Sequence, residues 1–168
     1  DWSSYVCSSD LGIMFEKPSN GKRTATPGWY NTAAYEEEAQ KAGLYAKSIN
    51  GDAFSKAVKE ETIALIKRDW GKADMVIYSL AAPRRTDTQG KTWVSALKTT
   101  GKPFTEKSMD LRNHTIVTKT VEPAAEEEVE GTKKVMGGED WLDWIKALKV
   151  ADVLEDNALT VAYSYIGP

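Results

Sequence analysis

Residues 75–80, Met-Val-Ile-Tyr-Ser-Leu, form a nearly continuous apolar run. Such a run is typical of a strand that is covered on both faces, as in a parallel sheet. The segment before it predicts a helix that Ser55 caps and Gly71 ends, with apolar side chains at spacings of three and four residues. Residues 44–49, Leu-Tyr-Ala-Lys-Ser-Ile, predict another strand, which precedes that helix and ends at an Asn-Gly turn pair. Strand, helix and strand in this order predict a βαβ unit with parallel strands.

The same alternation extends in both directions from this unit. Residues 12–15 predict an earlier strand. A predicted helix, which Asn31 caps and which runs to about Lys41, connects this strand to the next one. Residues 82–122 contain scattered Gly and Pro and short Thr- and Val-containing runs, which predict an irregular excursion with β character. Two further helices and a strand at residues 159–166 follow. The whole pattern predicts an α/β fold with a doubly wound parallel sheet.

Residues 1–11 do not share this pattern. They are rich in serine, show neither helical nor strand periodicity, and contain Cys7, the one cysteine of the chain. They resemble a translated sequencing adapter, and the alternative is a natural disordered tail. We favour the adapter, because Leu11 runs without any turn signal into the strand at residues 12–15. We therefore expect a non-native or disordered tail at 1–11 and one partial domain at 12–168, cut short at both ends.

Composition and charge argue against several kinds of partner. The 168 residues carry 22 basic and 25 acidic side chains and a formal net charge of −3, which gives no electrostatic reason to expect nucleic acid or an anionic membrane. No apolar run approaches the roughly 20 residues that cross a bilayer, and the first residues lack the order of a signal peptide. A single cysteine provides neither a disulfide framework nor a metal cluster. We expect a cytoplasmic protein with no nucleic-acid or membrane partner.

Ligands of doubly wound sheets bind beyond the carboxyl ends of the strands, so the residues that follow each strand are candidates for a site. Glu16 follows the first strand, where an acid in a dinucleotide-binding fold accepts hydrogen bonds from the adenosine ribose and repels a 2′-phosphate. Its alternative is an ordinary surface residue. Asp52 and Ala53 follow the next strand, where an aspartate can bind the adenine amino group and a small residue lets the ring approach. Asp52 is an equally good turn and helix-capping residue.

The third strand leads into Leu80-Ala81-Ala82-Pro83, where the small alanine residues let the backbone approach a nicotinamide ribose. Arg84 and Arg85 follow and could meet a phosphate or form a solvated pair, and we favour the solvated pair. The chain contains no Gly-x-Gly-x-x-Gly and no Walker loop. A phosphate-binding element, if the whole protein has one, is therefore expected upstream of residue 12.

Six segments carry a family resemblance. They read Phe-Glu-Lys-Pro at 15–18, Thr-Pro-Gly-Trp-Tyr-Asn-Thr-Ala-Ala at 26–34, Gly-Leu-Tyr-Ala-Lys-Ser-Ile-Asn-Gly-Asp-Ala-Phe at 43–54, Tyr-Ser-Leu-Ala-Ala-Pro-Arg-Arg-Thr at 78–86, Met-Gly-Gly-Glu-Asp-Trp at 136–141, and Thr-Val-Ala-Tyr-Ser-Tyr-Ile-Gly-Pro at 160–168. Together they resemble the bacterial V-type NADH-dependent enoyl-acyl carrier protein reductases, which are similar to, and often named as, trans-2-enoyl-CoA reductases. The resemblance runs in register from Gly12 to Pro168.

The resemblance implies a fold similar to that of short-chain dehydrogenases, with NADH bound on a Rossmann core. The site residues it implies are Phe15 and Glu16 at the adenosine portion, with Glu16 setting the preference for NADH, Asp52 and Ala53 at the adenine, Leu80 and Ala81 beside the nicotinamide half, and Tyr165 at the enoyl substrate. The implied reaction, in fatty acid synthesis, passes hydride from NADH to the β-carbon of a trans-2-enoyl thioester of CoA or acyl carrier protein. A tyrosine assisted by a lysine then stabilises or protonates the enolate. The full-length protein is expected to be a monomer.

The sequence also departs from the family. The Gly-rich pyrophosphate loop expected ahead of Ile13 is absent, and the family's Tyr-x8-Lys catalytic pair is expected shortly after Pro168. We therefore expect no catalytic residue within this chain and no turnover by this chain alone. The loop at residues 87–90 differs as well. Two rival functions remain: another NAD(H)-dependent oxidoreductase of similar fold that acts on a ketone or alcohol, and a non-catalytic NADH-binding domain.

Overall fold

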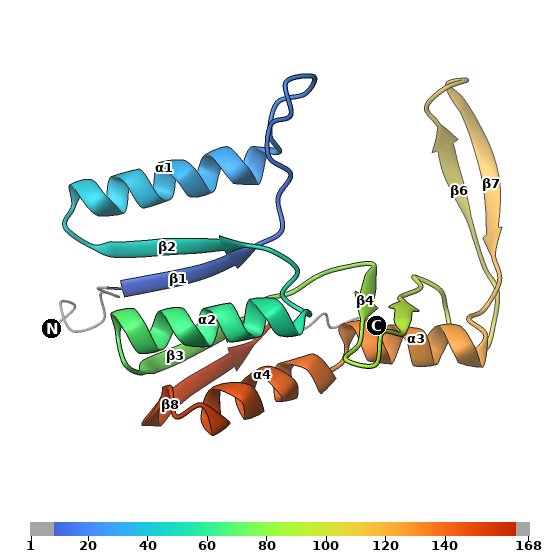
Figure 1. Cartoon of the computed structure of the whole chain (residues 1–168). Coiled ribbons are helices and arrows are strands. Elements are labelled where there is room, and N and C mark those ends of the chain that lie inside the picture. The colour runs from blue at the N-terminus through green and yellow to red at the C-terminus, as the bar shows by residue number, and fades with distance from the viewer. Residues whose placement is uncertain (1–8, 164–168) are drawn as a thin grey trace, which may run out of the picture. The chain divides into compact units, whose positions relative to one another are not determined.

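The computed structural model describes residues 9–163, so residues 1–8 of the expected tail and Tyr165 lie outside the described residues. The chain divides into two compact units. The first runs to Lys72 and includes Ala151–Val153, and the second comprises Ala73–Val150 and the chain from Leu154 onward. Each unit contains one pair of parallel strands with helices alongside (Figure 1).

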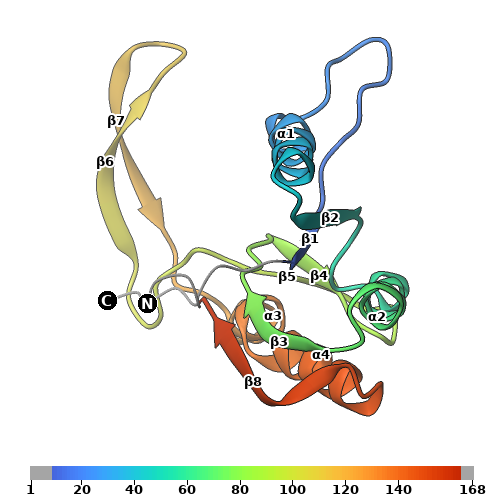
Figure 2. The ribbon, with the colours of Figure 1, turned by 90° about the vertical axis from the view of Figure 1, so that its left-hand side faces the viewer.

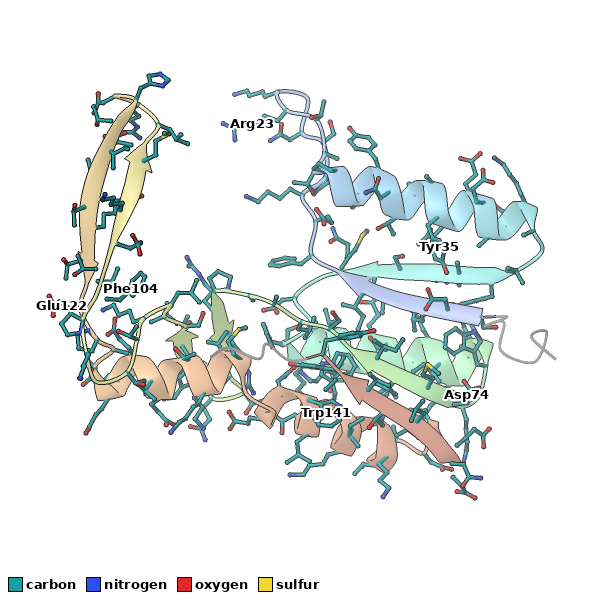
Figure 3. The ribbon with its side chains drawn as sticks, turned by 180° about the vertical axis from the view of Figure 1, so that it is seen from behind. Arg23, Tyr35, Asp74, Phe104, Glu122 and Trp141 are labelled. Carbon is teal, nitrogen blue, oxygen red and sulfur yellow. The ribbon has the colours of Figure 1, made fainter. Side chains whose placement is uncertain are left out.

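The first unit has the predicted strand-helix-strand-helix order. Its elements are β1 (Ser9–Met14), α1 (Pro27–Lys41), β2 (Tyr45–Asn50) and α2 (Lys56–Asp69). β1 and β2 pair in parallel, with α1 as the connection, and Met14 lies opposite Asn50 at the carboxyl ends of the two strands. The Tyr35 hydroxyl on α1 donates to the Asp10 carboxylate on β1 at 3.0 Å, which ties the helix to the strand pair (Figure 3). Because β1 and β2 end in register, the residues that follow them meet at one edge.

The two helices of this unit begin for different reasons. Ser55 caps α2 as predicted, because its hydroxyl accepts a hydrogen bond from the Val58 N–H at 3.3 Å. The prediction that Asn31 caps the preceding helix is wrong. α1 begins at Pro27, with Thr26 as its extended N-cap residue, and Asn31 lies inside the helix. Proline is favoured at the first helical position because its fixed φ suits the helix and its missing N–H has no intrahelical partner there.

The second unit pairs β3 (Ala73–Tyr78) in parallel with β8 (Leu154–Ala162), and Tyr78 lies opposite Ala162. Two helices, α3 (Glu126–Met136) and α4 (Glu139–Val150), precede β8. Trp144 and Leu148 are buried on α4, at the spacing of one helical face.

The stretch between β3 and α3 forms two antiparallel strand pairs. The strands are β4 (Arg84–Thr86) with β5 (Thr92–Val94), and β6 (Phe104–Asp110) with β7 (Thr115–Val121). Figure 2 shows the β6–β7 hairpin projecting from the rest of its unit. Phe104 and Glu122 mark its base (Figure 3). The irregular region that the sequence pattern places at 82–122 thus contains regular short strands.

The α/β class with parallel strand pairs is confirmed. Within residues 9–163 the strands form four two-stranded sheets, namely β1–β2, β3–β8, β4–β5 and β6–β7, and a single doubly wound sheet is not among them. In the same residues no helix is both long and apolar enough to span a bilayer.

Candidate functional site

Glu16 lies just beyond the carboxyl end of β1, and its backbone is fixed by the last residue of β2. The Asn50 side-chain Oδ1 accepts a hydrogen bond from the Glu16 N–H at 2.8 Å, and Asn50 Nδ2 donates to the Glu16 carbonyl at 2.9 Å. The Asn50 side-chain amide thus binds both backbone polar groups of Glu16. Glu16 therefore leaves the strand pair with a defined backbone position.

The Glu16 carboxylate lies against the first turn of α1. The Thr26 hydroxyl donates a hydrogen bond to Glu16 Oε2. A Cβ placed on Gly28 would overlap Glu16 Oε1, so the carboxylate occupies the place of a side chain at that position. The start of a helix is a favourable environment for a negative charge, because unpaired N–H groups and the helix dipole point there. The side chain is half-buried.

Phe15, the residue before Glu16, is far more exposed than Glu16. It is 80% exposed, which is high for a large apolar side chain. An exposed aromatic ring beside a half-buried acid is a chemistry that suits a nucleoside, because the ring offers stacking and the carboxylate accepts hydrogen bonds from hydroxyl groups. The assignment of Phe15 and Glu16 to the adenosine portion of a dinucleotide stays a prediction.

Asp52 and Ala53 lie in the loop after β2, in the same unit as Glu16. Asp52 Oδ1 accepts a hydrogen bond from the Phe54 N–H at 3.0 Å, and the Asp52 carbonyl accepts one from the Ser55 N–H at 2.9 Å. Asp52 therefore makes the turn contacts of its alternative interpretation. Ala53 is 8% exposed, and the buried Lys59 donates to its carbonyl at 3.1 Å. The structure brings Phe15, Glu16, Asp52 and Ala53 to the end of one strand pair, whereas a hollow of about 340 Å³ beside α1 is lined by none of them.

Leu80 and Ala81 belong to the second unit, where they follow β3. Leu80 is half-buried and Ala81 is exposed. The carbonyl of Tyr78, at the end of β3, accepts a hydrogen bond from the Tyr163 N–H at 2.9 Å. Further on, the Pro83 carbonyl accepts one from the Ser95 N–H, also at 2.9 Å. The segment that contains Leu80 and Ala81 is thus anchored by backbone hydrogen bonds at both ends.

The prediction that Arg84 and Arg85 form a solvated pair is wrong for Arg85. Arg84 is exposed, but Arg85 is 3% exposed. Its guanidinium donates to Glu139 Oε2 at 3.0 Å and to the Lys134 carbonyl at 2.9 Å, and it lies 3.9 Å from Asp140 Oδ1. Burial of an arginine requires this kind of charge compensation. Arg85 joins the strand after the Leu80–Ala81 segment to the start of α4.

Tyr78 completes this buried cluster, and the sequence pattern alone does not single it out. Its hydroxyl donates to Asp140 Oδ2 at 3.1 Å, and burial, reinforced by the adjacent Asp140 carboxylate, raises the pKa of the phenol well above its usual range. Asp140 shares one helical face with Trp144 and Leu148, at spacings of four residues. A carboxylate on a buried apolar face requires a polar partner, and this signal in the sequence could have revealed the cluster.

The described residues contain no cluster of three or more His, Cys, Asp or Glu that could hold a metal ion. Tyr165, the residue implied for substrate binding, lies outside residues 9–163, so its position is not described. The arrangement as a whole offers an adenosine-compatible edge in one unit and a backbone-anchored loop after β3 in the other.

Comparison with protein families gives a direct match. The model described as trans-2-enoyl-CoA reductase catalytic region matches residues 23–168. Among curated relatives, the trans-2-enoyl-CoA reductase [NADH] of Ruminiclostridium cellulolyticum is 54% identical over 159 residues, covering 94% of this chain and 40% of that protein. The enoyl-[acyl-carrier-protein] reductase [NADH] of Flavobacterium johnsoniae is 55% identical over 159 residues, with the same coverage of 94% and 40%. The chain therefore spans about 40% of the length of these relatives.

Solved structures agree with the family match. The crystal structure of the Treponema denticola trans-2-enoyl-CoA reductase in complex with NAD is similar with a TM-score of 0.87 and 45% sequence identity, covering 95% of this chain and 40% of that one. The Clostridium acetobutulicum trans-2-enoyl-CoA reductase in complex with NADH gives a TM-score of 0.86 and 43% identity, with coverage of 95% and 40%.

Proposed function

Because the chain belongs to the trans-2-enoyl-CoA reductase family, we propose that the whole protein reduces the 2,3-double bond of trans-2-enoyl thioesters with NADH. The observation that carries this proposal is the family match over residues 23–168, together with relatives of the same family solved with NAD or NADH. Relatives named for CoA and for acyl carrier protein are almost equally similar, at 54% and 55% identity. The proposed substrate is therefore the trans-2-enoyl thioester that both names share.

The described residues fit the adenosine half of NADH. We assign Phe15 and Glu16 to the adenosine, with the Glu16 carboxylate accepting hydrogen bonds from the ribose hydroxyls and repelling a 2′-phosphate. Asp52 and Ala53 are assigned to the adenine, and the Leu80–Ala81 segment to the nicotinamide half. Tyr165 is assigned to the enoyl substrate. In this assignment the chain binds and orients the cofactor, whose contribution is the hydride that reduces the β-carbon of the substrate.

The catalytic tyrosine and lysine of the proposed reaction are not assigned to this chain. We propose that they follow Pro168 in the whole protein, and that both parallel strand pairs belong there to one doubly wound, Rossmann-like sheet. We further propose that the whole protein is a monomer that works in the cytoplasm in fatty acid synthesis. A polypeptide of these 168 residues alone should accordingly give no NADH-dependent reduction of crotonyl-CoA.

The function is tested by steady-state kinetics of the full-length protein with crotonyl-CoA, and with crotonyl thioesters of acyl carrier protein to compare the two carriers. NADH oxidation with crotonyl-CoA but not with acetoacetyl-CoA is the expected result, and the reverse would indicate a ketone reductase of the same fold. Binding of NADH with no reduction of either substrate would support the non-catalytic NADH-binding alternative.

The cofactor assignment is tested by fluorescence titration of NADH and NADPH, with Glu16→Ala as the variant. The wild-type protein should bind NADH and reject NADPH, and Glu16→Ala should reduce that discrimination about tenfold or more, because the loss of hydrogen bonds to a charged group and the loss of repulsion act in the same direction. A variant with unchanged discrimination would remove Glu16 from the site.

A further inference from the structure

Thr26 occupies the N-cap position of α1 but does not cap the helix with its side chain. Its backbone is extended, as an N-cap residue requires, yet its hydroxyl makes no hydrogen bond to the helix N–H groups. A threonine in this position ordinarily accepts a hydrogen bond from the second or third helical N–H. Here the hydroxyl donates to Glu16 Oε2. The Thr26 hydroxyl therefore contacts Glu16, a candidate cofactor-binding residue, instead of capping α1.

The orientation of the Thr26 hydroxyl is itself fixed by Lys17. The Lys17 N–H donates to Thr26 Oγ1 at 2.9 Å, and the Thr26 N–H donates to the Lys17 carbonyl at 3.0 Å. A hydroxyl has one proton and two lone pairs, so a hydroxyl that accepts from Lys17 retains its proton for Glu16. The Lys17 carbonyl is a second acceptor at 3.4 Å. Removal of the Glu16 carboxylate would therefore leave the hydroxyl with a partner.

Gly28 has no conformational reason to be glycine. Its φ is not among the positive φ values of the described residues, and it lies in the first turn of α1, where alanine favours the helix more than glycine does. Space is the reason that remains, because a Cβ at this position would overlap Glu16 Oε1 and lie 2.5 Å from its Cδ. The atoms in the way are the flexible end of a side chain, so an added methyl group moves Glu16 and leaves the backbone in place.

We propose that Thr26 and Gly28 are specificity-determining positions, which fix the orientation of the Glu16 carboxylate and through it the preference for NADH over NADPH. This proposal rests on the proposed function of the protein. One carboxylate oxygen is held by Thr26, and the lone pairs that remain are free to accept ribose hydroxyls. A carboxylate held in one place loses little conformational entropy on binding, and its negative charge stays where a 2′-phosphate would be repelled.

The first test is Gly28→Ala in the full-length protein, read by fluorescence titration of NADH and NADPH. The variant should fold with unchanged or higher thermal stability, because alanine is the better helix former. Its Kd for NADH should rise about tenfold, its Kd for NADPH should not rise, and the discrimination between them should fall accordingly. Equal weakening of both cofactors, or no change in either, overturns the proposal.

The second test is Thr26→Val, which keeps the shape of the side chain and removes the hydroxyl. Loss of the hydrogen bond to the carboxylate should lower the discrimination between NADH and NADPH about fivefold to tenfold. Thr26→Ser should keep this discrimination within about twofold of the wild type, because serine retains the hydroxyl donor. Thr24→Val, in the exposed part of the same loop, is the matched control and should change neither Kd. A Thr26→Val protein with wild-type discrimination contradicts the proposed role.

Double variants separate this inference from the function on which it rests. In a Glu16→Ala background, Gly28→Ala and Thr26→Val should each change the NADH Kd by less than about twofold, since both act through Glu16. If Gly28→Ala or Thr26→Val weakens NADH binding equally in both backgrounds, the substituted residue has a structural role. That result overturns the inference but leaves the proposed function of Glu16 intact. If the Glu16→Ala protein discriminates between NADH and NADPH as the wild type does, Glu16 does not have its proposed function, and the inference fails with it.

Discussion

Each unit of the chain contains a tyrosine that donates its hydroxyl to an aspartate on a helix, and the two pairs differ in burial. In the first unit Tyr45, the first residue of β2, donates to Asp69, the last residue of α2. In the second, Tyr78, the last residue of β3, donates to Asp140 near the start of α4. The Asp69 side chain is 15% exposed and the Asp140 side chain 2%. The same two side chains thus pair in a partly exposed and in a buried environment.

The cations beside the two aspartates differ in the same way. Asp69 pairs with Arg68 and Lys47, whose side chains are 60% and 46% exposed. Asp140 lies beside Arg85, which is 3% exposed. Exposed ion pairs contribute little to stability because water and salt screen them, whereas a buried charge that loses its partner is costly. The comparison indicates that the structure at the carboxyl end of β3 depends on the buried cluster of Tyr78, Arg85 and Asp140.

The largest expected effect comes from removing the buried cation of this cluster. Arg85→Met keeps much of the side-chain volume but leaves buried carboxylates without their guanidinium, which should lower the free energy of unfolding by about 3–5 kcal/mol. Arg84→Met is the matched control, because Arg84 is its exposed neighbour and should change stability by less than about 0.5 kcal/mol. Urea denaturation of the full-length protein measures both. Equal losses in the two variants would show that burial of Arg85 does not matter.

Arg85 also shows why part of the fold could not be predicted from the sequence. The local signals were sufficient for the order of strands and helices and for the Ser55 cap, because hydrophobic period and capping chemistry act over a few residues. They did not show which strands pair, since β2 pairs with β1 and β3 pairs with β8. Whether an arginine is solvated depends on what covers it. Its partners Glu139 and Asp143 lie 54 and 58 residues further along the chain, so no local pattern around Arg85 records them.

The candidate site was predictable to a similar extent. The sequence alone places Glu16 at a strand end and so indicates a ligand-facing acid, because strand ends converge in parallel sheets. The contacts of its carboxylate could not be inferred, since they require the loop between β1 and α1 to fold back until Thr26 meets Lys17. The start of α1 is a local signal that the sequence does contain, because Pro27 at the first helical position outweighs the capping preference of Asn31.

The next effect in size compares the two aspartates directly. Asp140→Asn removes the charge that faces Arg85 and accepts from Tyr78, and it should lower the free energy of unfolding by about 2–3 kcal/mol, as expected for hydrogen bonds to a buried charge. Asp69→Asn should cost clearly less, because water can solvate the partners that remain. Both variants are read by urea denaturation. A larger loss for Asp69→Asn would reverse the ranking of the two clusters.

A smaller difference should separate the tyrosines. Tyr78→Phe deletes a hydroxyl whose acceptor is buried, and it should cost about 1–2 kcal/mol because the Asp140 carboxylate loses a donor. Tyr45→Phe should cost less, since Asp69 keeps Arg68 and Lys47 as donors. Thermal unfolding of the two variants and the wild type measures both losses. Identical unfolding midpoints for the two variants would contradict the predicted difference.

The smallest effect is a dependence on alkaline pH that both tyrosines should share. Burial, with the hydrogen bond to Asp69 as the next cause, raises the pKa of Tyr45 to about 12 from its ordinary value of 10.0. In the unfolded chain the phenol ionises near pH 10, so its contribution to stability is complete below pH 10 and is lost as the pH rises from about 10 to about 12. The gap in unfolding midpoint between wild type and Tyr45→Phe should therefore be constant from pH 8 to about 10 and narrow above it. The gap for Tyr78→Phe should keep narrowing to higher pH, because the greater burial of Tyr78 raises its pKa further. Gaps that stay constant through this range would show that neither phenol is held in its neutral form by the fold.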